Sequence, residues 1–279
     1  MRLLPLAVAT LLLTAIGFGT AQAAVGGKLD RTQLGSLSFN DPFTSAPTID
    51  VGCSSKTARY VDQFCGEGAT NSMYPRTHGE HECYSDPVFD GILPFTQFSA
   101  AGGIQINAAR HLFVVPACSG ALYSSGMLST INSFSMKHGY WEITAQMPKG
   151  GQGRWPAIWL MPQAGGWPPE IDIVEMAQGV WFGTQHSTAN HNGVAASAPA
   201  LGCLCDKPHI FGLLNTGTKV VWYVDNVEIA EQPMMAGNDV PYYLIINLAI
   251  YGGSWQGAET ATSAPAAMGV TAIRAYALK

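Results

Sequence analysis

Short apolar segments separated by turn residues recur along most of the chain, and almost none of them has helical spacing. They are rich in β-branched and aromatic residues and are bounded by glycine, proline, asparagine and serine clusters. This pattern is typical of short strands in an antiparallel sandwich. The clearest segments are "GIQINA", "YWEITAQM", "AIWLM", "EIDIVEM", "KVVWYVDNVEIA", "YYLIINLAIY" and "VTAIRAYAL". We therefore expect an all-β fold, with Asp225 and Asn226 at the tight turn of a hairpin.

The amino terminus has a different composition. An apolar run over residues 3–18 follows the single charge of Arg2, and the small residues of "AQAA" come next. This order is typical of a secretory signal peptide cut after Ala23, and the run is short for a membrane span. We expect residues 1–23 to be removed and residues 24–279 to form a single secreted domain, extracellular or periplasmic and not held in a membrane. A retained anchor is the alternative.

The charge of the chain limits its expected partners. Its net charge is −5, and only 12% of its residues are charged. No basic patch is available to neutralise phosphates, so we do not expect nucleic acid as a partner. A polar, thinly charged surface with many aromatic residues suits a neutral ligand that carries hydroxyl groups.

The cysteines of a chain that is expected to be exported predict disulfides. There are six of them, Cys53, Cys65, Cys83, Cys118, Cys203 and Cys205. We favour a local bridge between Cys53 and Cys65, which by chain-entropy arguments would stabilise by roughly 3 kcal/mol. The spacing of Cys203 and Cys205 also suggests a metal site, but a Cys-x-Cys pair without a second pair is a weak zinc signal. We expect these two to form disulfides with other cysteines.

The stretch "PPEIDIVEM" contains three acids in a chain that is otherwise poor in charge: Glu170, Asp172 and Glu175. Side chains alternate between the two faces of a strand, so Glu170 and Asp172 share a face and Glu175 falls on the other. A β-bulge with one extra residue, Ile173 or Val174, would return Glu175 to the face of its companions. We predict such a bulge, with the apolar residues of the strand turned toward the core.

Three carboxyl groups on one surface cannot all ionise freely, because like charges and aromatic neighbours raise their pKa values. Glycoside hydrolysis needs one ionised and one protonated carboxyl group, about 5–5.5 Å apart for retention of configuration. Asp172 would then tune the proton of the nucleophile. A calcium site is an alternative, although it would also draw on loop carbonyl oxygens. A solvated charged strand is another, although no lysine or arginine lies between Arg154 and Lys207.

The segment "EIDIVE" resembles the bulged active-site motif E-x-D-x-x-E of glycoside hydrolase family 16, in its laminarinase-like branch. Further segments resemble patterns of that family: "LSFNDPF", "GEHECYSD", "YSSGMLSTINSFSMKHGYWEITAQMPKGGQGRWPAIWLMP", "WYVDNVEI" and "YYLIINLAIYGGSWQG". The resemblance runs from about Leu37 to Tyr276. It implies an antiparallel β-jelly-roll sandwich whose concave sheet forms an open substrate groove, and a monomer.

Residue by residue, the resemblance implies Glu170 as nucleophile, Asp172 as assisting acid and Glu175 as general acid and base. The predicted function is a retaining endo-β-glycanase that hydrolyses internal bonds of a polysaccharide, by preference β-1,3- or mixed-linkage glucan. A galactan or bacterial exopolysaccharide is an alternative substrate, and a transglycosylase would use the same acids. A non-catalytic carbohydrate-binding protein is a further alternative, against which the intact set of three acids argues.

The resemblance also implies residues of the groove that contact the substrate. They are Trp155, Trp159, Trp167, Glu80, His186 and Trp255. Flat indoles stack on the apolar faces of sugar rings, although Trp159 would instead contribute to the core if it points inward. Glu82, close to Glu80, makes the assignment of the sugar-contacting acid ambiguous. A single histidine such as His186 is often structural.

Two departures from the family pattern bear on metal binding. Pro42 stands where the family usually has glutamate, and Thr271 stands where aspartate is frequent. The resemblance places both positions at a calcium site on the convex side, so the loss of both acids argues against calcium. We expect no metal and no cofactor. The insert at residues 195–208, together with Cys83, predicts a disulfide-stapled loop that reshapes the groove.

Overall fold

The computed structural model describes residues 26–50, 57–62, 79–84, 96–99, 102–115, 121–187, 194–198, 201–253, 257, 259–260 and 263–279. Over these residues the chain consists almost entirely of strands, with one short 3₁₀ helix at Arg31–Gln33. The same residues include no helix with the length and hydropathy to cross a bilayer. The expected signal peptide, the expected Cys53–Cys65 bridge, Cys118 and Trp255 lie outside the described residues.

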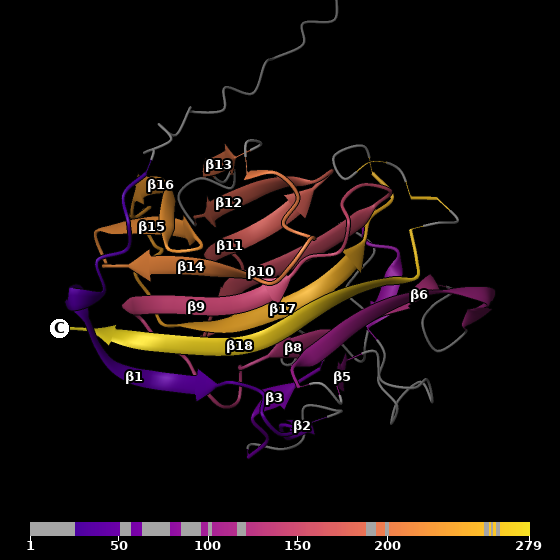
Figure 1. Ribbon diagram of the computed structural model, residues 1–279, viewed down its shortest axis with the longest axis horizontal. Coiled ribbons are helices and arrows are strands. Elements are labelled where there is room, and N and C mark those ends of the chain that lie inside the picture. The colour runs from indigo at the N-terminus through magenta and orange to yellow at the C-terminus, as the bar shows by residue number, and fades with distance from the viewer. Residues whose placement is uncertain are drawn as a thin grey trace, which may run out of the picture.

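The strands form two sheets that pack against each other (Figure 1). The first sheet follows the order β16 (Val227–Pro233), β15 (Lys219–Val224), β14 (His209–Asn215), β9 (Gly139–Gln146), β18 (Ala266–Leu278), β6 (Ile104–Val115), β7 (Ala121–Ser125) and β4 (Glu82–Tyr84). Two further strands join it, β1 (Leu34–Asp41) beside β18 and β5 (Thr96–Phe98) beside β6. Figure 1 shows β1 and β18, from opposite ends of the sequence, running side by side.

The second sheet follows the order β13 (Val194–Ala198), β12 (Val180–His186), β11 (Glu170–Ala177), β10 (Arg154–Pro162), β17 (Tyr242–Ile250), β8 (Met127–Ser129), β3 (Tyr60–Val61) and β2 (Ile49–Asp50). Pairing among the described strands is antiparallel except between β2 and β3 and between β4 and β7, which are short parallel pairs. The predicted all-β sandwich is therefore confirmed.

Alternation along β10 assigns its side chains to two faces. Ile158 and Leu160 are buried in the main core, which fills the space between the two sheets. Ala157, Trp159 and Met161 belong instead to a smaller apolar cluster. We call the side of the second sheet that carries this smaller cluster, opposite the main core, the outer face.

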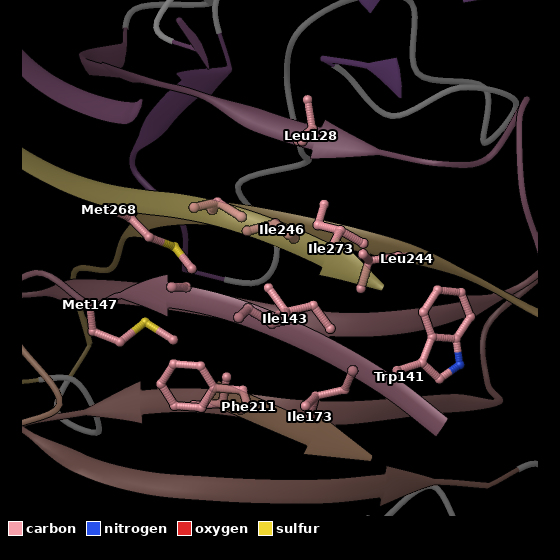
Figure 2. Packing of buried hydrophobic residues seen from close by; sticks show 14 of the residues in the cluster. Leu128, Trp141, Ile143, Met147, Ile173, Phe211, Leu244, Ile246, Met268 and Ile273 are labelled. Atoms are coloured by element: carbon pink, nitrogen blue, oxygen red, sulfur yellow. The ribbon is translucent and has the colours of Figure 1, made fainter. Parts of the chain in front are cut away.

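The main core draws on both sheets. Ile143 and Phe211 come from the first sheet, and Ile173, Leu244 and Ile246 come from the second (Figure 2). All five are at most 1% exposed. Burial of a side chain of this size contributes about 1.5–3 kcal/mol, so the core fixes which face of each strand is turned inward.

The hairpin between β15 and β16 turns at Asp225 and Asn226, as predicted. Their φ angles are 52° and 64°, the left-handed conformation that a two-residue hairpin turn requires at both central positions. Asp225 also accepts a hydrogen bond from the amide of Ile210 at 2.9 Å through its side chain. The turn is thereby tied to the neighbouring strand β14.

Candidate active site

The strand β11 contains a β-bulge next to the acids. Along β10 the pairs are Ile158 with Val174 and then Trp159 with Asp172, which leaves Ile173 as the extra residue. The register between β11 and β12 shifts at the same place. The predicted bulge is confirmed, and it lies where the parity of the strand has to change.

The bulge places all three acids on the outer face. Ile171, Ile173, Val174 and Met176 of β11 all belong to the main core on the opposite side. The carboxyl groups of Glu170, Asp172 and Glu175 contact one another and side chains of the outer face. A regular strand would have turned Glu175 into the core, so one additional residue decides whether the cluster exists.

A tryptophan from the first sheet holds the bulge from within the core. Trp222 of β15 is fully buried, and its Nε1 donates a hydrogen bond of 2.7 Å to the backbone carbonyl oxygen of Asp172. The indole passes over Gly183 of β12, where an added Cβ would lie 2.6 Å from Trp222 Nε1. A side chain at position 183 would therefore compete with the indole for the same space.

Each of the two terminal acids of the cluster accepts a hydrogen bond from an indole. Trp155 Nε1 donates to Glu175 Oε1 at 2.9 Å, and Trp167 Nε1 donates to Glu170 Oε2 at 3.0 Å. Trp167 is 49% exposed, so its ring is open to a ligand. The structure thus places two of the predicted sugar-binding tryptophans directly beside the acids.

His186 of β12 is paired with Glu170 of β11. Its Nε2 lies 3.3 Å from Glu170 Oε1 and 3.4 Å from Asp172 Oδ2. Its ring also contacts the ring of Trp167, with centroids 5.8 Å apart. The structure therefore places this predicted groove histidine within the acid cluster.

The surroundings raise the pKa of all three carboxyl groups. Burial lifts the pKa of Glu170 well above its usual range, the charge of Asp172 adds to this, and His186 opposes it. Burial and then the charge of Glu175 raise the pKa of Asp172. Burial also raises the pKa of Glu175, against the lowering effects of His186 and of the Trp155 N–H. The cluster therefore keeps a proton to higher pH than three separate carboxyl groups would.

Trp159 lies on the outer face but is only 9% exposed. Its Nε1 donates to Asn247 Oδ1 at 2.7 Å, Asn247 Nδ2 donates to the Tyr84 hydroxyl at 2.8 Å, and that hydroxyl donates to Glu80 Oε2 at 3.1 Å. This chain of hydrogen bonds links β10 and β17 to Tyr84 of β4 and to Glu80 just before that strand. Trp159 is outside the main core, and its contact with a sugar stays a prediction.

Glu80 and Glu82 are both buried, at 8% and 3% exposure. Glu82 Oε2 accepts a hydrogen bond from the amide of Ile250 at 2.6 Å, whereas Glu80 accepts one from Tyr84. Glu82 is also hydrogen-bonded to Glu80 and to Tyr84, so both acids are joined to the side-chain network of the outer face, and Glu80 as the sugar-contacting acid stays a prediction. Burial raises the pKa of both groups, and the charge of Glu82 raises that of Glu80 further.

Sequence reasoning missed the residues that support the site. Asn247 gave a signal, because it is a polar residue at an outward position of an otherwise apolar strand. Tyr84 stands in a segment that resembled the family, but no role followed from that. Nothing in the sequence indicated the role of Trp222. A tryptophan in an apolar strand is expected to belong to the core, and the acceptor of its hydrogen bond is a backbone atom of the other sheet.

The expectation for Cys203 and Cys205 was wrong. The two sulfur atoms lie against each other, with Cα atoms 5.1 Å apart, rather than beside cysteines elsewhere in the chain. This Cα separation is within the range of disulfides.

The structure also bears on the calcium site that the family resemblance places near Pro42. The side chain of the neighbouring Asp41 accepts hydrogen bonds from the Phe43 amide, the Arg59 guanidinium and the Tyr60 hydroxyl, so its oxygens are already occupied. Pro42 has no side-chain oxygen to offer, and the Thr271 hydroxyl donates to the carbonyl oxygen of Thr144 at 3.4 Å, so these two residues do not fit calcium.

A two-sheet sandwich with a bulged acidic strand and indoles at its carboxyl groups defines a carbohydrate-active protein of the jelly-roll class. The chain belongs to the glycosyl hydrolases family 16, whose sequence pattern matches residues 95–270. The resemblance noted in the sequence is thereby confirmed, together with the fold that it implied.

Three similar proteins illustrate the relationship. The endo-1,3-1,4-beta-glycanase ExsH of Rhizobium meliloti (strain 1021) is 36% identical over 193 residues, which are 67% of this chain and 40% of that protein. The structure of SCLam, a non-specific endo-beta-1,3(4)-glucanase, matches with a TM-score of 0.73 at 25% identity, over 94% of this chain and 98% of that one. The structure of the laminarinase catalytic domain of Thermotoga petrophila RKU-1 matches with a TM-score of 0.71 at 26% identity, over 88% of this chain and 98% of that one. The chain spans about 40% of the length of two curated relatives that it matches.

Proposed function

We propose that the chain is a retaining endo-β-glucanase. The observation that carries this proposal is the bulge at Ile173, which brings Glu170, Asp172 and Glu175 to one face with an indole N–H on each terminal acid. Membership of the family and the names of the similar proteins support the same reaction class.

In the first step, an oxygen of ionised Glu170 attacks the anomeric carbon of the sugar. The bond from that carbon to the glycosidic oxygen breaks, and protonated Glu175 gives its proton to the departing oxygen. The product is a glycosyl ester on Glu170 and a shortened polysaccharide. The N–H of Trp167 and the nearby His186 stabilise the ionised form of Glu170 before the attack.

In the second step, the carboxylate of Glu175 takes a proton from water while the water oxygen bonds to the anomeric carbon. The ester bond to Glu170 breaks, which restores both carboxyl groups to their starting states. Asp172 contacts both catalytic acids and is the most deeply buried of the three, so its charge sets how the proton is shared. Two inversions leave the configuration of the sugar unchanged.

We propose β-1,3- or mixed-linkage β-glucan as the substrate. Trp167 exposes about half of its surface beside Glu170, and the partly buried Trp155 contacts Glu175, so both indoles can stack on the sugars next to the cleaved bond. The similar proteins are described as acting on 1,3- and 1,3-1,4-β-linked polymers. A galactan or an exopolysaccharide is the alternative that a substrate panel decides.

The test compares wild type with Glu170→Gln on laminarin and lichenan, with products sized by mass spectrometry and the anomer followed by NMR. We expect internal cleavage with retention by wild type, and a loss of at least about a thousandfold in kcat for the variant with oligosaccharide binding intact. Products longer than the substrate would indicate a transglycosylase. Binding of laminarin by wild type without any product would indicate a carbohydrate-binding protein instead.

We also infer that the chain is exported, is cut after Ala23, and carries disulfides. The apolar leader and the pairing of Cys203 with Cys205 support this, since disulfides persist in oxidising compartments. Intact-mass measurement of the secreted protein, with and without reduction, tests both points, and a chain that keeps residues 1–23 contradicts the first. We propose a monomer, which light scattering of the same sample checks.

A further inference from the structure

Three potential metal ligands converge in the acid cluster. They are one carboxyl oxygen each from Glu170 and Asp172 and the imidazole of His186, and their ligand atoms all lie within 4.8 Å of one another. The group combines one nitrogen with two oxygens. It therefore differs from a purely acidic cluster in the type of cation that it suits.

Two of the three spacings between the ligand atoms match tetrahedral coordination. Bonds of about 2.0–2.1 Å from a zinc ion to nitrogen and oxygen place neighbouring ligand atoms about 3.3–3.4 Å apart. His186 Nε2 lies 3.3 Å from Glu170 Oε1 and 3.4 Å from Asp172 Oδ2. Two edges of the tetrahedron are thus already formed by these side chains.

One ligand is buried without a hydrogen-bond partner. Asp172 is 2% exposed, and within the described part of the chain its Oδ2 accepts no hydrogen bond, although it is the oxygen that faces His186. The side chains of Glu170 and His186 keep 14% and 24% of their surface exposed, so a cation can reach the group from solvent. A cation bonded to Oδ2 would satisfy an acceptor that the protein leaves open.

We propose that Glu170, Asp172 and His186 form a binding site for Zn²⁺ or a similar divalent transition-metal ion, and that the metal inhibits the enzyme when it binds there. Coordination withdraws electron density from the Glu170 carboxylate and so lowers its nucleophilicity, and the bound ion would stand beside the nucleophile where the sugar has to bind, so we expect metal and substrate to exclude each other. Ca²⁺ and Mg²⁺ take six or more oxygen ligands and do not suit this group. Binding stands on the geometry alone, whereas the inhibition rests on the proposed glucanase activity.

Equilibrium dialysis of the full chain against zinc chloride tests the binding. We expect one tightly held Zn²⁺ per chain, and an affinity at least about tenfold weaker in both His186→Gln and Asp172→Asn. His209→Gln is the matched control, because His209 also lies between two aspartates, Asp206 at 3.0 Å and Asp225 at 2.8 Å, but binds them through opposite ring nitrogens. Equal zinc affinity in wild type and His186→Gln would overturn the proposal, as would a loss confined to His209→Gln.

Competition separates this proposal from the proposed function. We expect a laminarin oligosaccharide to displace the dialysed Zn²⁺, and Zn²⁺ to inhibit laminarin hydrolysis competitively and reversibly on addition of EDTA, while the same concentration of Ca²⁺ has no effect. If wild type hydrolyses none of the polysaccharides, the proposed function fails while the dialysis result still decides the metal site. Zinc inhibition that persists unchanged in His209→Gln supports the site, and non-competitive inhibition overturns the inhibitory role.

Discussion

The indole Nε1 of Trp222 donates a hydrogen bond of 2.7 Å to the backbone carbonyl oxygen of Asp172. Trp222 belongs to the first sheet and Asp172 to the second, so the bond crosses the main core and ends at the β-bulge. Bulges leave backbone groups outside the regular ladder, and a buried carbonyl without a donor is costly. The shape of the acidic strand therefore depends on a residue of the opposite sheet.

Trp222→Phe should lower both stability and turnover. The variant leaves the carbonyl of Asp172 buried without its donor, at a cost of about 1–3 kcal/mol beyond the lost packing. We expect a lower denaturant midpoint and a fall in kcat that exceeds the change in KM, because the three acids lose their alignment. Urea unfolding and steady-state kinetics on laminarin measure the two effects.

Trp181→Phe is the matched control for that experiment. Trp181 is 1% exposed, and its Nε1 has no hydrogen-bond partner in the described part of the chain, so the same substitution removes volume but no bond. An equal loss of stability and kcat in the two variants would show that the hydrogen bond of Trp222 does not hold the bulge.

Gly183→Ala should displace the Trp222 indole that supports the bulge and so lower stability. The added Cβ would lie 2.6 Å from Trp222 Nε1 and 2.7 Å from the ring of Trp181, and neither rigid indole can yield easily. Overpacking of this kind costs about 1–3 kcal/mol. Gly269→Ala is the control, since its Cβ would meet only the flexible end of Gln105 at 3.2 Å. We expect the midpoint temperature of thermal unfolding of Gly183→Ala to lie well below those of wild type and of the control.

The two indoles at the acids should act on opposite limbs of the pH profile. The Trp155 N–H lowers the pKa of Glu175, so Trp155→Phe raises that pKa and keeps the general acid protonated to higher pH. We expect the alkaline limb of kcat/KM to move to higher pH. The measurement is kcat/KM on laminarin across the pH range.

Trp167→Phe removes the donor to Glu170 instead. The pKa of the nucleophile then rises, so its ionised form is reached only at higher pH. We expect the acid limb of the kcat/KM profile to move to higher pH while the alkaline limb stays in place. A variant pair that shifts the same limb in the same direction would show that the assignment of nucleophile and general acid is wrong.

Glu82→Gln should stabilise the protein at neutral pH. Burial raises the pKa of Glu82 in the folded state. Between the unfolded-state and the folded-state pKa of this group the native chain binds more protons than the unfolded chain, so the protein loses stability as the pH rises through that range. The amide keeps an oxygen for the Ile250 N–H and also removes the charge that acts on Glu80. We expect a gain of about 1 kcal/mol at pH 7 that shrinks toward about pH 4.

Glu231→Gln serves as the comparison in the same urea titrations. Glu231 lies on the surface in an ion pair with Lys219, so its loss should change the free energy of unfolding by at most about 1 kcal/mol and should not stabilise. A gain of equal size in both variants would contradict the explanation from burial at Glu82.

Much of the site followed from local patterns. The separation of Glu170, Asp172 and Glu175 predicted the bulge, because strand parity is a property of the backbone and depends on nothing distant. The hairpin at Asp225 and Asn226 was equally local. The partners of Cys203 and Cys205 were predicted wrongly, because spacing does not show which sulfur atoms the loops bring together.

The sequence by itself determined the strands, the face that each one buries and the acids that share a surface, since these depend on alternation and on the order of residues along one segment. Only the tertiary structure decided which side chains reach that surface from elsewhere. Trp222 supports the bulge from the other sheet, and His186 meets two acids through the pairing of β11 with β12. Such contacts depend on strand register and on how the two sheets pack. Neither can be predicted from the pattern of the residues that lie between the two partners in the sequence.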